Sequence, residues 1–118
     1  MIICVDFDGT CVTNEYPNIG KDLPNCVDVL RKLNEKKVDI ILLTQRDGKP
    51  LDDAVKWFRE NDIDLYGIND NPEQATWSHS RKVYANLYID DRAIGCPLSQ
   101  GAVDWKAVER ILMEMDIL

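Results

Sequence analysis

The chain has 118 residues, with 21 Asp and Glu against 14 Lys and Arg and a formal net charge of -7. This length predicts one domain, spanning residues 1–118, and a hydrophobic content of 45% excludes a disordered chain. The acidic excess argues against binding of extended nucleic acid, because phosphate contacts need clustered Lys and Arg. It does not exclude a protein that handles phosphate through a divalent cation.

Cysteine spacing and the first residues limit the compartment and the kind of site. No two of the four cysteines form a C-x-x-C pair, and the single histidine is far from them, which argues against structural zinc (Cys4, Cys11, Cys26, Cys96 and His79). The start of the chain has no basic region and an apolar run of only four residues after Met1. We therefore expect neither a signal peptide nor a membrane span, and a cytoplasmic protein with free thiols. Cys4 and Cys26 are expected in the core.

The first half of the chain alternates β-prone and amphipathic segments. Residues 2–7 predict a strand that ends at Asp8–Gly9. Residues 24–36 predict a helix with Pro24 in its first turn. Residues 38–44 form a near-continuous apolar run, which is typical of a strand buried on both faces of a parallel sheet.

The second half continues the alternation. The pattern predicts a helix over 51–61, a strand over 63–68, a polar loop over 69–79, a short helix over 80–86 and a strand over 86–90. Asp104 is expected to be the N-cap of a last helix. This order of elements predicts an α/β fold with a parallel sheet, in which ligands bind beyond the carboxyl ends of the strands.

Five polar residues lie at the carboxyl ends of predicted strands and should therefore meet at one edge of the sheet (Asp6, Asp8, Thr44, Asp90 and Asp91). Residues two apart in an extended segment face the same side, so Asp6 and Asp8 can face one ligand. Gly9 lets the backbone turn close to that ligand. Clustered carboxylates repel and raise one another's pKa, and a hard cation such as Mg²⁺ relieves this repulsion.

Each of these motifs alone has an ordinary structural explanation. An Asp-x-Asp at a strand end is usually a turn or a capping device, and Asp90-Asp91-Arg92 alone fits a solvated turn. The combination in this order is more specific.

Four segments together resemble the haloacid dehalogenase (HAD) superfamily. Asp6-Phe7-Asp8-Gly9-Thr10 resembles its first motif, Thr44 its second, Lys82 its third and Asp90-Asp91 its fourth. The resemblance covers residues 2 to about 95 and is strongest to small hydrolase-like proteins of bacterial and phage type. Those also show a stretch like Tyr16–Gly20 and an ending like Ile89–Arg92. The resemblance implies a three-layer, Rossmann-like fold with a central parallel sheet flanked by helices.

The resemblance also implies a mechanism. Asp6 would attack phosphorus to give an aspartyl-phosphate, and Asp8 would protonate the leaving oxygen and then activate water. Lys82 would neutralise charge on Asp6 and the phosphate. An acid two residues after the nucleophile favours phosphotransfer over dehalogenation, so we expect a phosphatase.

The expected ligand sets follow from the same motifs. The metal ligands would be Asp6, the Asp8 carbonyl and Asp90, with Mg²⁺ as the cofactor, and Asp91 would be either a further ligand or a residue that orients Lys82 or a metal-bound water. The phosphate-binding residues would be Gly9, Thr10, Thr44, Gln45 and Arg46. For Arg46 two interpretations stand: binding a second anionic group of the substrate, or a surface ion pair with Asp47 or Asp52.

The chain is too short between its motifs to house a cap domain. An open site suggests a small phosphorylated substrate, an accessible phosphate on a macromolecule, or a cover from a second subunit in a homodimer. The alternatives are a nucleotidase or polynucleotide-end phosphatase, and a non-catalytic phosphate- or metal-binding regulatory domain. In the polar loop, His79 is expected to be exposed, and Trp77 either anchors the loop or stacks on a substrate ring.

Overall fold

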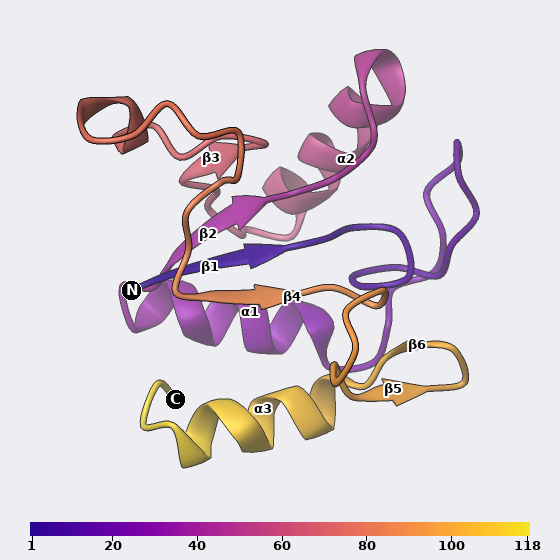
Figure 1. Ribbon diagram of the computed structural model, residues 1–118. Coiled ribbons are helices and arrows are strands. Elements are labelled where there is room, and N and C mark those ends of the chain that lie inside the picture. Colours follow the sequence, from indigo (N-terminus) through magenta and orange to yellow (C-terminus); the bar gives the residue numbers. More distant parts are fainter.

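The centre of the molecule is a parallel sheet with the strand order β3-β2-β1-β4 (Figure 1). The computed structural model describes all of residues 1–118. The strands are β1 (Ile2–Val5), β2 (Asp39–Leu42), β3 (Gly67–Ile68) and β4 (Leu87–Ile89). Val5 lies opposite both Leu42 and Ile89, so β1, β2 and β4 end level with one another. The predicted parallel sheet is therefore confirmed, and its carboxyl edge is shared by three strands.

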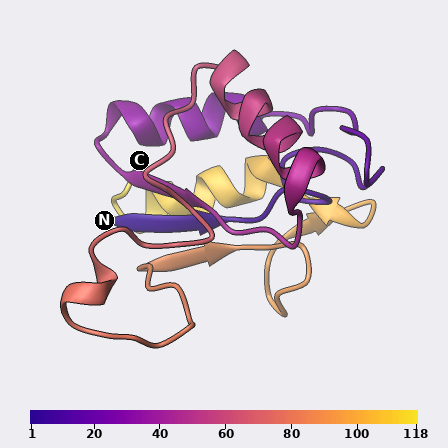
Figure 2. The same ribbon diagram turned by 90° about the horizontal axis from the view of Figure 1, so that it is seen from above.

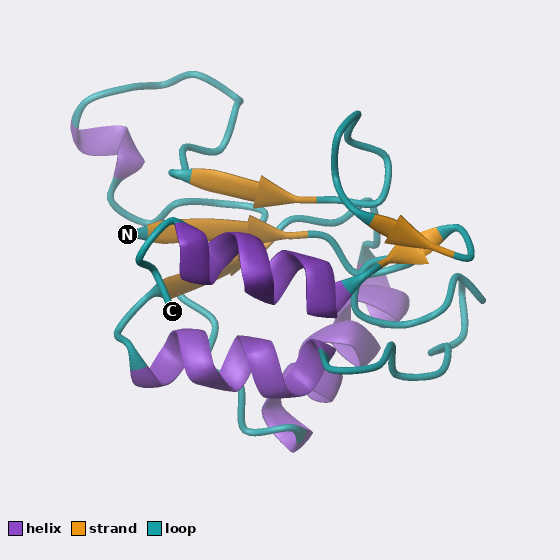
Figure 3. Ribbon diagram, turned by 90° about the horizontal axis from the view of Figure 1, so that it is seen from below, coloured by secondary structure: helices purple, strands orange, loops and turns teal.

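All three helices pack on one face of this sheet. They are α1 (Cys26–Glu35), α2 (Gly48–Glu60) and α3 (Trp105–Glu114), and Figure 3 shows α1 and α3 side by side beneath the strands. Alternate residues of β1, and Phe7 just beyond it, belong to the core that the helices close (Ile3, Val5 and Phe7 with Leu30, Leu33, Trp57, Phe58, Trp105 and Leu112). The apolar stripe of each helix explains this layer, because only one side of each helix can be removed from water.

The other face is covered by irregular chain. A small cluster of Cys4, Ile41 and Ala85 lies there, with Tyr66 and Val83 packed against it. Figure 2 shows the segment that contains the 3₁₀ helix η1 (Gln74–Thr76) on the side of the strands away from α1 and α2. The three-layer, Rossmann-like fold without a cap is confirmed, with one thick helical layer and one thin layer.

The thin layer differs from the prediction in one element. Residues 80–86 form no helix, because the buried Gln74 side chain takes their backbone groups. Gln74 Nε2 donates to the carbonyls of Ser80 and Lys82, at 3.2 and 2.8 Å, and Gln74 Oε1 accepts from Tyr84 N at 2.8 Å. Backbone groups bonded in this way are not available to a helix.

A short hairpin joins the sheet to the last helix. It consists of β5 (Leu98–Ser99) and β6 (Ala102–Val103), and it turns at Gln100 and Gly101, whose φ values are 53° and 81°. The alternation of apolar and polar residues that marks a strand cannot be detected over two residues, so the sequence did not predict this hairpin.

The end of the chain follows the prediction. Asp104 caps α3, since its Oδ1 accepts hydrogen bonds from Lys106 N at 3.1 Å and Ala107 N at 3.2 Å. Cys4 and Cys26 are buried as expected, and all four cysteines are free. None of the helices is both long and apolar enough to cross a bilayer.

Candidate functional site

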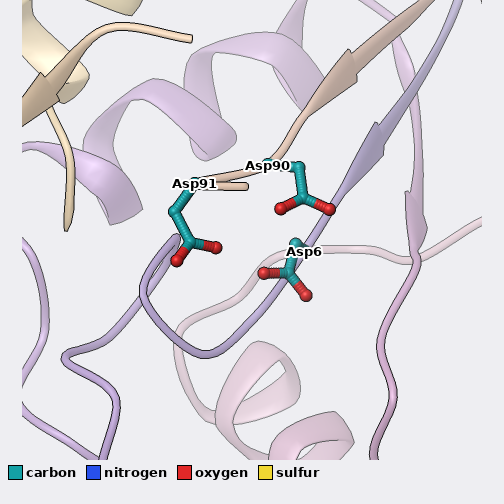
Figure 4. A group of neighbouring side chains, drawn as sticks. All are labelled: Asp6, Asp90 and Asp91. Carbon is teal, nitrogen blue, oxygen red and sulfur yellow. The ribbon is translucent and has the colours of Figure 1, made fainter. Parts of the chain in front are cut away.

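Two neighbouring strand ends supply the acidic residues. Asp6 directly follows β1, and Asp90 and Asp91 directly follow β4. Asp6 N donates to Ile89 O at 3.0 Å, which extends the ladder one residue beyond the strands and fixes Asp6 beside Asp90. Figure 4 shows the three carboxylates gathered between the two strand ends. The predicted convergence at the carboxyl edge is confirmed for these residues.

The three carboxylates are close enough to share one cation. One oxygen from each of Asp6, Asp90 and Asp91 lies within 4.8 Å of the other two, and all three side chains are half-buried. No cationic side chain pairs with any of them.

The Thr10 side chain contacts two members of this cluster. Its buried hydroxyl lies 3.1 Å from Asp6 Oδ2 and 3.2 Å from Asp91 Oδ1, and it accepts a hydrogen bond from Asp91 N at 3.1 Å. A hydroxyl has one proton, so it can donate to only one of the two carboxylates at a time. Thr10 therefore positions the carboxylates but leaves much of their mutual repulsion in place.

The crowding appears in the pKa of Asp6, which is raised from 3.8 to about 7. Burial is the largest cause, and the carboxyls of Asp91 and Asp90 raise the pKa further. Hydrogen bonds from Phe7 N and Thr10 lower it and do not compensate. A bound divalent cation would favour the ionised form.

Gly9 is required where it lies. Its φ is 79°, and a Cβ atom there would collide with the carboxylate of Asp91. The glycine was predicted to contact phosphate, and the structure gives it the further function of making room for Asp91.

The Asp8 side chain is turned to Arg46 and away from the carboxylate cluster. Arg46 Nε donates to Asp8 Oδ2 at 2.8 Å and Arg46 Nη2 donates to Asp8 Oδ1 at 2.7 Å. The Asp8 carbonyl, by contrast, accepts no hydrogen bond from the protein. Only this carbonyl is free to act as the metal ligand that the resemblance implies for Asp8.

Arg46 is only 2% exposed, and every N–H of its guanidinium is used. Besides Asp8, it donates to the carbonyls of Pro17 at 3.1 Å, Asn18 at 2.7 Å and Pro50 at 3.1 Å. The pKa of Arg46 is raised, chiefly by the hydrogen bond to Asp8.

Both earlier interpretations of Arg46 therefore need correction. Its ion-pair partner is the half-buried Asp8 and neither Asp47 nor Asp52. It also has no N–H left for a second anionic group of a substrate. Its position instead ties the loop over 11–22 to the motif at the end of β1.

Thr44 and Gln45 lie at the same edge. Thr44 N donates to Asn69 Oδ1 at 2.7 Å, and Thr44 Oγ1 accepts from Arg46 N at 3.2 Å. Both residues line an open cavity of about 640 Å³, and Gln45 is exposed. This volume lies in the range of small-molecule sites.

Lys82 does not reach this cavity. Its ammonium lies 5.5 Å from the centre of the Tyr88 ring, and it is exposed on the thin layer. The chain from η1 runs back to the amino end of β4, so Lys82 comes before that strand while the acidic residues follow it (Figure 1). The expected contact of Lys82 with Asp6 is absent from the structure, and that assignment is corrected.

Three residues of the cavity were not predicted as site residues: Asn14, Tyr16 and Arg92. Arg92 is exposed, forms no ion pair, and follows Asp91 directly, which is a signal that the sequence carried. Asn14 and Tyr16 lie on the loop over 11–22. Their place at the cavity depends on how Arg46 fastens that loop, and no local pattern encodes it.

Comparison with known proteins gives one informative match. A solved structure described as that of the conserved protein coded by a locus from Bacteroides thetaiotaomicron is 39% identical, covers 98% of this chain and 91% of that chain, and superposes with a TM-score of 0.84. No family model and no curated protein matches the chain.

Proposed function

The chain belongs to the same family as the conserved Bacteroides thetaiotaomicron protein, whose description names no activity, and we propose from the site itself that it is a Mg²⁺-dependent phosphoester hydrolase. The observation that carries the proposal is the meeting of Asp6, Asp90 and Asp91 at the carboxyl ends of β1 and β4. The order and identity of these residues resemble the HAD phosphatases.

The donor set suits Mg²⁺. Asp6, Asp90 and Asp91 offer carboxylate oxygens, and the unbonded Asp8 carbonyl offers a neutral one. Hard oxygen ligands from a few carboxylates, completed by water and substrate phosphate, are typical of protein-bound Mg²⁺. When bound, the ion would offset the carboxylate repulsion and polarise the phosphoryl oxygens.

The chain's own groups account for both halves of the reaction. An oxygen of Asp6 attacks phosphorus as the bond to the ester oxygen breaks, and the leaving alcohol takes a proton from Asp8. Asp8 then removes a proton from a water molecule, which attacks the acyl phosphate and releases inorganic phosphate. This second step restores the Asp6 carboxylate.

The ion pair with Arg46 constrains Asp8. Both Asp8 oxygens accept hydrogen bonds from Arg46, so at least one of these bonds must break before Asp8 carries a proton to the leaving group. Arg46 is therefore a positioning residue in this proposal, because it holds Asp8 and the loop over 11–22.

Arg92 takes the part that was expected of Lys82. It lines the cavity, is exposed and has no carboxylate partner. A guanidinium there can donate two parallel hydrogen bonds to a phosphate. The cavity has space for a small phosphorylated substrate or for the end of a longer one.

A non-catalytic phosphate- or metal-binding domain is the second candidate. The ion pair between Asp8 and Arg46 favours this candidate, because a domain that only binds phosphate or metal does not need Asp8 as a general acid.

A phosphoester panel tests both candidates. It should contain p-nitrophenyl phosphate, sugar phosphates, nucleotides and phosphorylated oligonucleotides, each assayed with Mg²⁺ and with EDTA. We expect turnover only with Mg²⁺ and a loss of at least about 1000-fold in Asp6→Asn, since the nucleophile is removed. Asp39→Asn, at the amino end of β2, is the matched control and should keep full activity.

The outcomes separate the candidates. Absence of turnover on the whole panel, with Mg²⁺ still raising the unfolding midpoint, would support the non-catalytic domain. Absence of both effects would contradict both. Full turnover by Asp6→Asn would remove Asp6 as the nucleophile.

A further inference from the structure

The segment from Gln74 to Ile89 has a composition unlike the rest of the chain. It contains none of the 21 acidic residues, although it holds the only histidine and two of the 14 basic residues. The net charge of -7 therefore hides a positive stretch, which crosses the thin layer and continues into β4.

Aromatic rings on this segment face solvent. Trp77 is 61% exposed and Tyr84 is 44% exposed, and their rings meet edge to face with centroids 5.4 Å apart. Tyr88 is also exposed, and the Lys82 ammonium lies over its ring. Neighbouring exposed rings offer apolar area that a ligand can cover, whereas Trp57 and Trp105 are buried in the core.

The basic side chains of the segment have no carboxylate partner. Arg81 and Lys82 are exposed and form no ion pair, and His79 is exposed as well. His79 and Arg81 line a polar hollow of about 300 Å³ with Ser78 and Ser80. Asp70 is the one carboxylate that lines this hollow, and Lys82 lies directly next to Arg81 in the chain.

The segment is held in a fixed shape. Gln74 is 7% exposed and binds three backbone groups between Ser80 and Tyr84. Asn71 adds a hydrogen bond to Tyr84 O at 3.1 Å. The backbone that carries the rings and the basic side chains is therefore ordered before a ligand binds.

We propose that this surface, made by Trp77, His79, Arg81, Lys82, Tyr84 and Tyr88, binds a short stretch of single-stranded nucleic acid. Unpaired bases stack on exposed aromatic rings, while neighbouring cations contact the phosphates. An acidic peptide would use the cations and leave the rings uncovered. The -7 charge of the whole chain confines the contact to this one positive stretch. The proposal is independent of the hydrolase, since it involves no residue of the acidic cavity.

The test is a titration with fluorescein-labelled oligothymidylate of eight nucleotides that carries no terminal phosphate, in EDTA and at 50 mM salt. We expect saturable binding with a Kd of about 1–100 μM, weakening as salt is added. Trp77 is the only exposed tryptophan, so bound bases should quench the intrinsic fluorescence.

Two variants and one control make the test specific. Trp77→Ala should weaken binding by about tenfold, because one stacking platform is lost. Arg81→Glu with Lys82→Glu should weaken it at least as much and flatten the salt dependence. Lys106→Glu with Arg110→Glu makes the same charge change on exposed, unpaired positions of α3 and should leave binding within twofold.

Several results would overturn the proposal. These are no saturable binding, an equal loss in the α3 control, or equal affinity for a duplex of the same length. Equal binding of a polyglutamate peptide would assign the surface to an acidic protein partner. Because the assay contains no Mg²⁺ and the oligonucleotide carries no terminal phosphate, none of these results bears on the hydrolase, and failure of the phosphoester panel does not bear on this surface.

Discussion

Arg46 at the acidic cavity and the basic side chains of the surface from Trp77 to Tyr88 lie in opposite environments. In the cavity, Arg46 is buried and all of its donors are used within the protein. On the surface, Arg81 and Lys82 are exposed and form no ion pair. Arg46 is thus structural, whereas Arg81 is free for a ligand, as Arg92 is at the cavity itself. Burial and pairing decide which, and the total charge does not.

The largest expected effect concerns Arg46, the structural cation. Arg46→Met should lower the free energy of unfolding by about 3–5 kcal/mol, because it leaves the half-buried Asp8 carboxylate and three carbonyls without partners. Urea unfolding measures this. Arg59→Met on the exposed side of α2 is the control and should change stability by less than about 0.5 kcal/mol. If both variants lost the same free energy of unfolding, the ion pair of Arg46 with Asp8 would stabilise the fold no more than an exposed arginine does.

The next effect separates a cation in the cavity from one outside it. If the chain is the proposed hydrolase, Arg92→Ala should lower kcat/KM by about 10–100-fold, since the proposal places this guanidinium on the phosphate. Lys82→Ala should change kcat/KM by less than about twofold, because the ammonium lies over Tyr88. If Lys82→Ala lowered kcat/KM more than Arg92→Ala did, Lys82 would be assigned to the reaction after all, and the contrast between the two regions would fail.

A smaller effect concerns the repulsion in the cavity. The raised pKa of Asp6, about 7 against 3.8, means that this carboxyl lowers stability as pH rises from about 4 through 7. Asp6→Asn should therefore stabilise the metal-free protein by about 1–2 kcal/mol at pH 8 and by much less at pH 4.5. Thermal unfolding in EDTA at both pH values measures this difference. If the stability difference between Asp6→Asn and wild type were the same at both pH values, repulsion among the carboxylates would not explain the raised pKa.

The smallest effect is on the exposed surface. Trp77→Ala should change the free energy of unfolding by less than about 0.5 kcal/mol, because the ring is 61% exposed. Trp105→Phe should cost about 1–3 kcal/mol, since it leaves the buried Thr10 carbonyl without its 2.6 Å hydrogen bond. A large loss in Trp77→Ala would mean that the ring anchors its loop, which was the alternative explanation of this residue.

The acidic edge could be predicted from the sequence because parallel strands bring their carboxyl ends together whatever the loops do. Asp6, Asp90 and Asp91 needed only the correct strands, and strong apolar runs revealed those strands. The N-cap at Asp104 was predictable for a similar reason, since its hydrogen bonds are made within three residues.

The partners of Arg46 and Lys82 could not be predicted, since they depend on the paths of two loops. The pair between Arg46 and Asp8 joins residues 38 apart and forms only when the loop over 11–22 folds back. Lys82 was placed by analogy, and its path depends on the hydrogen bonds of Gln74, an amide that shows no pattern in the sequence.

The indole N–H of Trp105 reaches the Thr10 carbonyl across 95 positions of sequence, and Val103 N likewise bonds Gly9 O. The loop that carries the acidic motif is thus fastened by a segment far along the chain. Strands β1, β2 and β4 can pair without residues 103–105, but the carbonyls of Gly9 and Thr10 then lose these hydrogen bonds. Because Thr10 contacts both Asp6 and Asp91, the geometry of the acidic cluster depends on the hairpin and α3 as well as on the strands that carry the carboxylates.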